Sequence, residues 1–367
     1  MHPIVIAAGG TGGHFFPAEA LAAELIARGQ RVALMTDART GNQISGGIFA
    51  SAERFVIKGA GIAGHGPVRA ARAAAALLAG TAQARRILTM LNATAVVGFG
   101  GYPSVAPVLA ARLVRRRPVV VLHEQNSVLG RANRFLSRHA DLLALSFPGT
   151  TRVPSRLRTD ITGLPVRPAI RALANRVYAT PTDRINLLVL GGSLGARVFS
   201  DVVPPALAAL PDTLRARLSV TQQCRAEDMD RVRAAYVTSG IAADLAPFFA
   251  DIADRLGAAH LVIARAGAST VAELAVAGRP AILVPLPGSI DDHQIGNARA
   301  LAAPGGAWTM PQPEFTPDAL SARLQDLLMH PEKLNDAAIA ARGIARDDAA
   351  ARLAEIVENL VRQEARP

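Results

Sequence analysis

Short runs of apolar residues alternate with longer helix-forming segments along the whole chain. In the first half we expect strands at Ile4–Ala8, Arg31–Thr36, Ala95–Gly98 and Pro118–Leu122. The segments between them predict helices at Pro17–Arg28, Val68–Asn92 and about Ser104–Arg115, the last with Ser104 as its N-cap. Nearly continuous apolar strands separated by helices indicate a parallel sheet that is covered on both faces.

The second half repeats this alternation after a segment rich in helix-breaking residues. That segment, Thr159–Pro168, contains Gly163, Pro165 and Pro168, and we expect the joint between two domains there. Beyond it we expect strands at Ile185–Leu190, Leu218–Gln222, His260–Ala264 and Ala281–Pro285. Helices are expected at Ala250–Ala259, Ser269–Ala277, Thr316–His330 and Asp347–Gln363. At 367 residues the chain is long enough for two domains with separate cores.

A glycine-rich loop follows a short apolar strand in each half. The first is Gly9-Gly10-Thr11-Gly12-Gly13 and the second is Gly191-Gly192-Ser193-Leu194-Gly195. Each precedes a helix-forming stretch, which places backbone N–H groups and a helix N-terminus at the carboxyl end of a strand, where anions bind. The alternative for the first loop is a tight turn, but four glycines in five positions exceed what a turn requires. The two copies indicate two similar α/β domains facing one cleft.

The first loop does not match the common nucleotide-binding motifs. It lacks the G-x-G-x-x-G spacing and the Lys-Ser/Thr pair of a P-loop, which disfavours an NAD-dependent dehydrogenase. His14 directly follows the loop and is a candidate general base for a hydroxyl nucleophile. Taken alone, a histidine at a helix start is more often a capping residue.

Polar residues in the second half offer further candidate chemistry. Gly267-Ala268-Ser269-Thr270 lies between a strand and a helix, and the first turn of that helix would bind a diphosphate. Glu273 is placed to accept both hydroxyls of a ribose, or alternatively it stabilises the helix. Asp291-Asp292-His293 is a poor metal site, because three adjacent loop residues rarely converge on one ion. We favour a sugar-binding loop that includes Gln294 and Asn297.

The chain is strongly basic. Its net charge is +11 and its pI is near 11.1, and arginine supplies nearly all of the positive charge. This excess indicates nucleic acid, anionic lipid headgroups or phosphorylated substrates, whereas a compositional bias would explain only the preference for arginine. Basic residues flank Leu77 and Leu78 in one predicted helix, which suits docking onto an anionic membrane, although an ordinary amphipathic helix has the same pattern. They are Arg69, Arg72, Arg85 and Arg86, and Arg115-Arg116-Arg117 ends another helix.

Cysteine usage and the first residues bear on the cellular compartment. Cys224 is the only cysteine, so an intrachain disulfide and a cysteine-based metal site are excluded, which fits a reducing cytoplasm. The chain enters a strand without a basic stretch and cleavage site, and we expect no signal peptide. No apolar run approaches the ~20 residues that span a bilayer.

Five motifs, in order and at matching intervals over essentially the whole chain, together resemble the MurG family of bacterial glycosyltransferases. They are Gly9–Pro17, Gly100–Ser104, His123–Asn126, Gly191–Arg197 and Arg265–Thr270. The resemblance implies an α/β fold of the GT-B type, with two Rossmann-like domains whose parallel sheets face a cleft. It implies an acceptor- and membrane-binding domain at residues 1–162, onto which a C-terminal helix at about 347–367 packs back, and a UDP-GlcNAc-binding domain at 163–346.

The resemblance also implies an activity. Members of the family move N-acetylglucosamine (GlcNAc) from UDP-GlcNAc to the C4 hydroxyl of the muramoyl sugar (MurNAc) in lipid I, which is undecaprenyl-pyrophosphoryl-MurNAc-pentapeptide. The product is lipid II, formed with inversion and without a metal or other cofactor. We therefore expect a peripheral enzyme at the cytoplasmic face of the inner membrane that binds no nucleic acid, with other cell-wall synthesis proteins as candidate partners.

Site residues are carried over from the family motifs to the matching positions of this chain. The implied donor-binding residues are Thr11, Gly12, Gly13, Asn126, Arg167, Ser193, Phe249, Ala268, Ser269, Thr270, Val271, Ala272, Glu273 and Gln294. The acceptor-binding candidates are Gly10, His14, Gly101 and Tyr102, with His14 as the candidate catalytic base. Two positions depart from the family, because Leu194 replaces a frequent glutamine and His293 stands where some members have a second glutamine.

Two other functions fit parts of the sequence. A UDP-GlcNAc 2-epimerase shares the architecture and the donor. A non-catalytic protein that binds a nucleotide sugar or a lipid diphosphate is disfavoured, because Asn126, Ser193, Glu273 and Gln294 are retained together.

Overall fold

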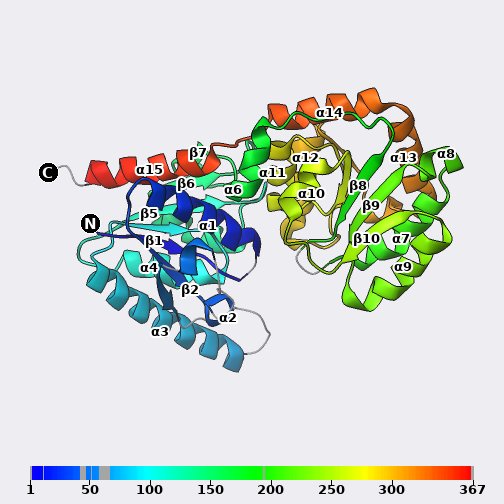
Figure 1. Ribbon diagram of the computed structural model, residues 1–367. Coiled ribbons are helices and arrows are strands. Elements are labelled where there is room, and N and C mark those ends of the chain that lie inside the picture. Colours follow the sequence, from blue (N-terminus) through cyan, green and yellow to red (C-terminus); the bar gives the residue numbers. More distant parts are fainter. Residues whose placement is uncertain are drawn as a thin grey trace. The chain divides into compact units, whose positions relative to one another are not determined.

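The computed structural model describes residues 2–10, 12–41, 47–50, 52–57, 67–192 and 195–364. The chain forms two compact units, of which unit 1 comprises Met1–Arg167 with Asp347–Pro367, and unit 2 comprises Pro168–Arg346 (Figure 1). Every pairing within the two sheets is parallel, and each sheet belongs to a Rossmann-like α/β unit. This confirms the predicted fold class.

Unit 1 contains a seven-stranded sheet in the order β3-β2-β1-β4-β5-β6-β7. Its strands are β1 Ile4–Ala7, β2 Val32–Thr36, β3 Glu53–Val56, β4 Ala95–Gly98, β5 Val119–Glu124, β6 Leu142–Leu145 and β7 Thr159–Ile161. Its α-helices are α1 Gly12–Ala27, α2 Ala38–Gly41, α3 Pro67–Leu91, α4 Val105–Ala111, α5 Arg131–Leu136 and α15 Ala349–Glu364.

Alternation of side chains along the strands of unit 1 produces two buried layers. On one face Ile4 and Ile6 of β1 pack with apolar residues of α1 and α15. On the other face Val5 packs with residues of α3 and α4. Figure 1 shows these helix pairs on opposite sides of the sheet. Both faces of the sheet are therefore buried under helices, as expected for a parallel sheet with nearly continuous apolar strands.

Unit 2 contains a six-stranded sheet in the order β10-β9-β8-β11-β12-β13. Its strands are β8 Ile185–Leu190, β9 Leu218–Gln223, β10 Ala242–Ala246, β11 Leu261–Ala264, β12 Ala281–Leu283 and β13 Ala307–Thr309. Its α-helices are α6 Pro168–Arg171, α7 Arg197–Ala208, α8 Asp212–Arg215, α9 Met229–Thr238, α10 Ile252–Ala258, α11 Ala268–Ala277, α12 His293–Ala302, α13 Pro317–Met329 and α14 Pro331–Gly343. The largest core lies between this sheet and α7, α9 and α13.

Three boundaries differ from the sequence-based expectations by more than two residues. Helix α1 begins at Gly12 rather than Pro17, so His14 lies inside its first turn and Pro17 lies within the helix. Helix α4 ends at Ala111 rather than Arg115. The two units divide after Arg167, inside the Thr159–Pro168 segment, rather than after residue 162.

Candidate active site

The first glycine loop is held by the end of the neighbouring strand β2. A Cβ atom at Gly9 would lie 2.5 Å from Asp37 Oδ2, so only glycine fits there. The next residue, Gly10, donates its backbone N–H to Thr40 Oγ1 at 2.8 Å, and that hydroxyl donates to Asp37 Oδ2 at 3.0 Å. Arg39 donates to the Gly10 carbonyl at 3.2 Å. The loop therefore has a fixed shape, although Thr11 itself lies outside the described residues.

The candidate acceptor residues lie together beside this loop. A Cβ atom at Gly101 would lie 3.8 Å from His14 Nε2, and one at Gly10 would lie 3.9 Å from Tyr102 Cε1. His14 is half-buried and Gly101 has a φ of 66°, a conformation that favours glycine. Burial and the neighbouring Asp37 carboxylate raise the pKa of the Tyr102 phenol. The four residues thus come from two loops at the carboxyl edge of the unit 1 sheet.

The side chain of Ser104 links the two loops instead of capping a helix. Ser104 precedes α4, but its hydroxyl makes no capping bond. Its Oγ lies 2.8 Å from the carbonyl oxygens of Ala7 and of Gly100, and it donates to them. Ser104 thus occupies the N-cap position, as predicted, but makes no capping bond, because its φ and ψ are helical and Pro107, three residues on, has no N–H to donate.

A buried carboxylate shapes the loop that carries Asn126. Glu124 is 2% exposed, and its Oε1 accepts hydrogen bonds from the backbone N–H and the side-chain Nδ2 of Asn126, at 3.0 and 3.2 Å. Its Oε2 accepts from Gly130 N at 2.9 Å and from Asn133 Nδ2 at 2.8 Å. Glu124 thus orients the Asn126 amide. Sequence reasoning placed it in a motif but gave it no role, and the signal for that role is its position two residues before Asn126.

His123 is a neutral, fully buried residue behind the same loop. Its Nε2 lies 3.1 Å from the Gly163 carbonyl and donates to it, which leaves Nδ1 to accept from Gln125 Nε2 at 3.2 Å. Burial, with a smaller contribution from the nearby His14, lowers the pKa of His123 to about 4. His123 therefore supports the site as an uncharged residue near His14.

Arg167 lies at the end of unit 1 and packs on an aromatic ring. Its guanidinium carbon is 5.1 Å from the centroid of the Phe16 ring, which is a cation–π contact. Phe16 belongs to α1, as do Gly12, Gly13 and His14. The side chain of Arg167 is thus placed next to the first turn of α1, and its contact with the donor remains a prediction.

In unit 2 the second glycine loop is also closely packed. A Cβ atom at Gly191 would lie 2.4 Å from the backbone nitrogen of Ala196, so no other residue fits. Gln223, at the end of β9, accepts from Gly191 N at 3.1 Å and donates from Nε2 to the Gly192 carbonyl at 2.9 Å. Sequence reasoning missed Gln223, because nothing in the local pattern indicates a partner in a neighbouring strand. Ser193 and Leu194 lie outside the described residues.

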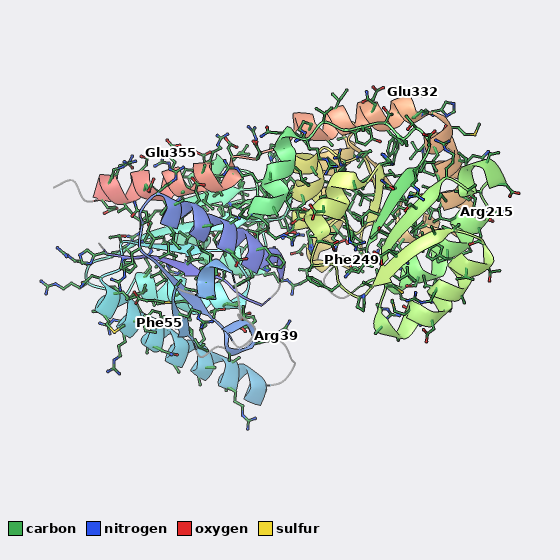
Figure 2. All side chains as sticks on the ribbon, viewed as in Figure 1. Arg39, Phe55, Arg215, Phe249, Glu332 and Glu355 are labelled. Atoms are coloured by element: carbon green, nitrogen blue, oxygen red, sulfur yellow. The ribbon has the colours of Figure 1, made fainter. Side chains whose placement is uncertain are left out.

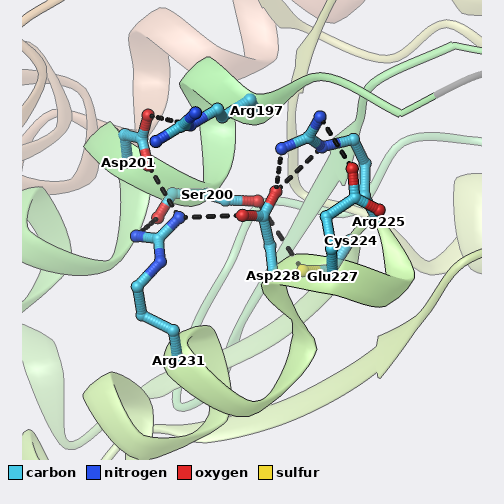
Figure 3. A network of polar contacts seen from close by, with 8 residues as sticks. All are labelled: Arg197, Ser200, Asp201, Cys224, Arg225, Glu227, Asp228 and Arg231. Atoms are coloured by element: carbon cyan, nitrogen blue, oxygen red, sulfur yellow. Dashed lines mark hydrogen bonds and ion pairs between the residues drawn. The ribbon is translucent and has the colours of Figure 1, made fainter.

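A network of ion pairs fixes the start of α7 beside this loop (Figure 3). Arg231 bridges Asp201 at 2.7 Å and Asp228 at 3.1 Å, and Asp228 also accepts from Arg225 Nη2 at 2.7 Å. Arg225 passes close to the loop, because a Cβ atom at Gly195 would lie 2.6 Å from its Cγ. These arginines are neutralised by carboxylates, so we assign them to holding the loop.

Helix α11 presents its N-terminus at the carboxyl edge of the unit 2 sheet. Its N-cap is Gly267, and Ala268, Ser269 and Thr270 form the first turn. Ser269 Oγ is buried, and it has no hydrogen-bond partner among the residues that the structure describes. A buried hydroxyl without a partner is costly, and a bound phosphate oxygen would satisfy it. The remaining candidates on the helix, Val271, Ala272 and the half-buried Glu273, follow within the next turn.

Two further donor candidates lie on loops of unit 2. Phe249 is 7% exposed, and the Arg255 guanidinium carbon stacks 4.1 Å from its ring centroid; Figure 2 labels Phe249 just before α10. Gln294 accepts from the backbone N–H of Leu286 at 3.0 Å, so its amide oxygen holds the β12–α12 loop. This contact orients the Gln294 side chain but uses part of its hydrogen-bonding capacity. In the same region Asn297 is buried and donates to the Ala266 carbonyl at 3.2 Å.

Comparison with known proteins identifies the family. Residues 4–144 match the glycosyltransferase family 28 N-terminal domain, and residues 186–358 match the family 28 C-terminal domain. A protein of Granulibacter bethesdensis named UDP-N-acetylglucosamine--N-acetylmuramyl-(pentapeptide) pyrophosphoryl-undecaprenol N-acetylglucosamine transferase is 61% identical over 97% of this chain and 93% of its own length. A protein of Gluconobacter oxydans with the same name is 55% identical over 98% of this chain and 99% of its own length.

A solved structure agrees with these relatives. The crystal structure of Acinetobacter baumannii MurG has a TM-score of 0.79 and is 31% identical, covering 98% of this chain and all of that one. The chain belongs to the MurG family. This membership confirms the GT-B fold and makes the protein an N-acetylglucosaminyltransferase-type enzyme of glycosyltransferase family 28. For a MurG-family chain, the glycine loops, the Glu124 loop and α11 form the candidate active-site surfaces of the two units.

Proposed function

We propose that the protein transfers GlcNAc from UDP-GlcNAc to the C4 hydroxyl of MurNAc in lipid I and so forms lipid II for peptidoglycan synthesis. The observation that carries this proposal is 61% identity over 97% of the chain to a relative named for that reaction. Relatives at 55 and 54% identity bear the same name. The product forms with inversion, as a β-1,4-linked disaccharide.

Unit 2 holds the donor in this proposal. The first turn of α11, with Ala268, Ser269 and Thr270, and the glycine loop containing Ser193 bind the diphosphate, while Glu273 binds the ribose hydroxyls. Backbone N–H groups and the helix dipole then stabilise the negative charge that develops on the departing UDP. The unsatisfied Ser269 hydroxyl supports this role, because it lies where a phosphate oxygen would accept its proton. Phe249 contacts the uracil, and Val271 and Ala272 bring the helix backbone close to the nucleotide.

Unit 1 contributes the acceptor site and the base. His14 removes the proton from the C4 hydroxyl as that oxygen attacks the anomeric carbon, and Gly10, Gly101 and Tyr102 position the acceptor. The proximity of His14 to Gly101, and of Tyr102 to Gly10, supports this assignment. Thr11, Gly12, Gly13, Asn126 and Arg167, with Gln294 of unit 2, contact the donor sugar and nucleotide.

The test is incubation of the purified protein with radiolabelled UDP-GlcNAc and a short-chain lipid I analogue. We expect a labelled lipid-linked disaccharide and stoichiometric UDP. Formation of ManNAc or UDP-ManNAc without an acceptor would identify an epimerase instead. Tight UDP-GlcNAc binding without either product would indicate a binding protein and contradict the proposal.

We also propose that unit 1 docks onto an anionic membrane through α3 and the end of α4. Leu78, Met90 and Leu113 are 72, 64 and 56% exposed, and they line a groove of about 630 Å³ with Arg85 and Arg86. Exposed apolar side chains beside arginines suit insertion among anionic headgroups. Leu77 packs inward instead, and Arg117 is paired with Asp141 at 2.5 Å. The described helices include none that is both long and apolar enough to cross a bilayer.

The docking proposal predicts salt-sensitive binding to vesicles that contain anionic lipid. Neutralising Arg69, Arg72, Arg85 and Arg86 together should weaken binding by more than tenfold, since each basic residue near such a surface contributes about 1 kcal/mol. Vesicle co-sedimentation at two salt concentrations measures this effect. Neutralising Arg184, Arg217, Arg233 and Arg323 of unit 2 is the matched control and should leave binding unchanged. Intact binding after the first change would exclude this surface.

A further inference from the structure

A basic pocket lies at the amino edge of the unit 2 sheet, opposite the edge that carries the glycine loop and the start of α11. It has a volume of about 210 Å³. Arg176, Asn186, His260 and Arg279 line it, together with backbone of 257–259 at the end of α10. Asn186 is the second residue of β8, and His260 immediately precedes β11. The proposed transfer reaction makes no use of these residues.

The two arginines of this pocket are not neutralised by a carboxylate. Arg279 is 2% exposed, and its guanidinium donates to the carbonyls of Leu256 at 3.0 Å and Gly257 at 2.7 Å. Within the described chain, no acidic side chain forms an ion pair with Arg176 or Arg279, and Arg342 adds positive charge close by. Burial and the neighbouring Arg176 and Arg342 lower the pKa of Arg279 to about 10, so it still carries its charge at neutral pH. A buried cation without a counter-ion is an unusual arrangement.

His260 and Arg176 also carry N–H donors, whereas the Asn186 amide donates to the Ala258 carbonyl at 3.0 Å. His260 Nδ1 accepts from the backbone N–H of Asn186 at 2.9 Å, so the ring proton is on Nε2. Arg176 extends over Gly257, where a Cβ atom would lie 2.7 Å from its Nη1. Tyr178 donates to the His260 carbonyl at 2.9 Å and packs under Arg279 at 5.4 Å, which fixes the chain on that side. A pocket of fixed shape lined by N–H donors selects an anion.

Neutralisation of helix C-termini does not account for all of this charge. Arg279 bonds carbonyls at the end of α10, and Arg342 bonds the Val276 and Ala277 carbonyls at the end of α11. Two helix C-termini carry about −0.5 charge each, roughly −1 in total. Arg176 and Arg279 alone, neither of which is ion-paired within the described residues, supply two positive charges. The balance is therefore positive, and both arginines line the pocket.

We propose that this pocket is a binding site for a small tetrahedral oxyanion, namely inorganic phosphate or the phosphate group of a small phosphomonoester. Guanidinium groups bind phosphate through paired N–H donors, and Arg176 with Arg279 offers two such groups. Pockets for larger ligands occupy about 300–1,000 Å³, so a volume of about 210 Å³ excludes a nucleotide sugar. The proposed donor phosphates lie at the N-terminus of α11, and this pocket lies near its C-terminus. The ten residues of α11 span roughly 15 Å, so the two sites can be occupied together.

The test is thermal unfolding of the full chain in increasing inorganic phosphate, at constant ionic strength set with chloride and with saturating UDP. UDP occupies the donor site, so the part of the remaining phosphate-dependent rise in Tm that Arg176→Gln weakens reports the new pocket. We expect a rise that saturates in wild type and in Arg233→Gln, an exposed arginine of α9. Arg176→Gln, an exposed side chain whose loss should not impair folding, should weaken phosphate binding about tenfold.

Two results would overturn the proposal. One is the absence of a phosphate effect in the presence of UDP, which would assign all phosphate binding to the donor site. The other is an unchanged effect in Arg176→Gln. Glucose 1-phosphate in place of inorganic phosphate distinguishes the two ligand sources, and a stronger shift with it would identify a phosphomonoester as the ligand. A negative result would not contradict the proposed glycosyltransferase activity, because a separate assay tests that activity.

Discussion

The buried carboxylate of Glu124 determines the shape of the loop that carries Asn126. Its two oxygens accept from N–H donors that lie within nine residues along the chain, at 2.8 to 3.2 Å. Glu124→Gln would turn an NH2 group toward some of these donors and should destabilise unit 1 by about 2 kcal/mol. Urea unfolding followed by circular dichroism measures the change. Glu53→Gln, which breaks an exposed ion pair with Arg31, should cost at most about 1 kcal/mol.

Glu124→Gln should also reduce transfer activity through Asn126. The variant is expected to raise KM for UDP-GlcNAc more than Glu53→Gln does, because the Asn126 amide loses the acceptor that orients it. Equal stability of the two variants would contradict the assigned role of Glu124.

His123 makes the stability of unit 1 depend on pH. The unfolded chain binds a proton near the ordinary histidine pKa of about 6.5, whereas the folded chain does so only at about 4. Stability conferred by the neutral ring is therefore present above pH 6.5 and is lost as the pH falls toward 4, by about 3 kcal/mol. Urea titrations at pH 7 and pH 4.5 should show this loss. The loss of unfolding free energy between these two pH values should be smaller in His123→Asn than in wild type and unchanged in His2→Asn. An equal loss in all three proteins would refute the role of His123.

At the scale of elements, α15 completes the core of unit 1 although it comes from the far end of the chain. Leu353, Ala354 and Val357 are fully buried against the sheet and α1. Arg28, just after α1, pairs with Glu358 at 3.2 Å, which fixes α15 along its polar edge. The hydrophobic stripe of α15 is visible in the sequence, but its partner is 330 residues away and follows only from the resemblance to the family.

Truncating one side chain of α15 should separate the stabilities of the two units. Leu353→Ala should cost unit 1 about 3 kcal/mol, because it leaves a cavity between α15 and the sheet. Trp308 is the only tryptophan and lies in β13 of unit 2, so its fluorescence reports that unit. Circular dichroism should show an earlier transition while the Trp308 transition stays in place. Glu355→Ala, on the exposed face of α15 (Figure 2), should change neither.

The strands that sequence patterns predict are those in the middle of the sheets. β1, β4, β5, β8 and β11 are apolar on both faces, and their ranges agree with the predictions within two residues. The four edge strands, β3, β7, β10 and β13, and the short interior strand β6 were not predicted. β3 reads Glu-Arg-Phe-Val and is largely exposed, so it lacks the apolar run on which the prediction depends. Such strands form because a neighbouring strand offers backbone hydrogen bonds, and their own composition does not reveal this.

At the scale of the whole molecule, the sequence predicts where chemistry is located but not what holds it in place. The glycine loops and the start of α11 are visible as motifs, because glycine and helix-start residues have local requirements. Thr40 and Gln223, which bond the two loops, lie 30 and 32 residues from their partners. Such contacts require the folded sheet order. The basic pocket likewise combines residues from Arg176 to Arg279, which no local pattern connects.

The central claim is that the two glycine loops have different tasks, with chemistry at His14 in unit 1 and UDP binding at α11 in unit 2. The most direct test measures kcat and the UDP-GlcNAc Kd in His14→Ala and Glu273→Gln, with His2→Ala as control. His14→Ala should lower kcat roughly 10²–10⁴-fold and leave Kd unchanged. Glu273→Gln should raise Kd roughly tenfold with a much smaller effect on kcat. Unchanged turnover in His14→Ala, or unchanged UDP-GlcNAc binding in Glu273→Gln, would contradict the account.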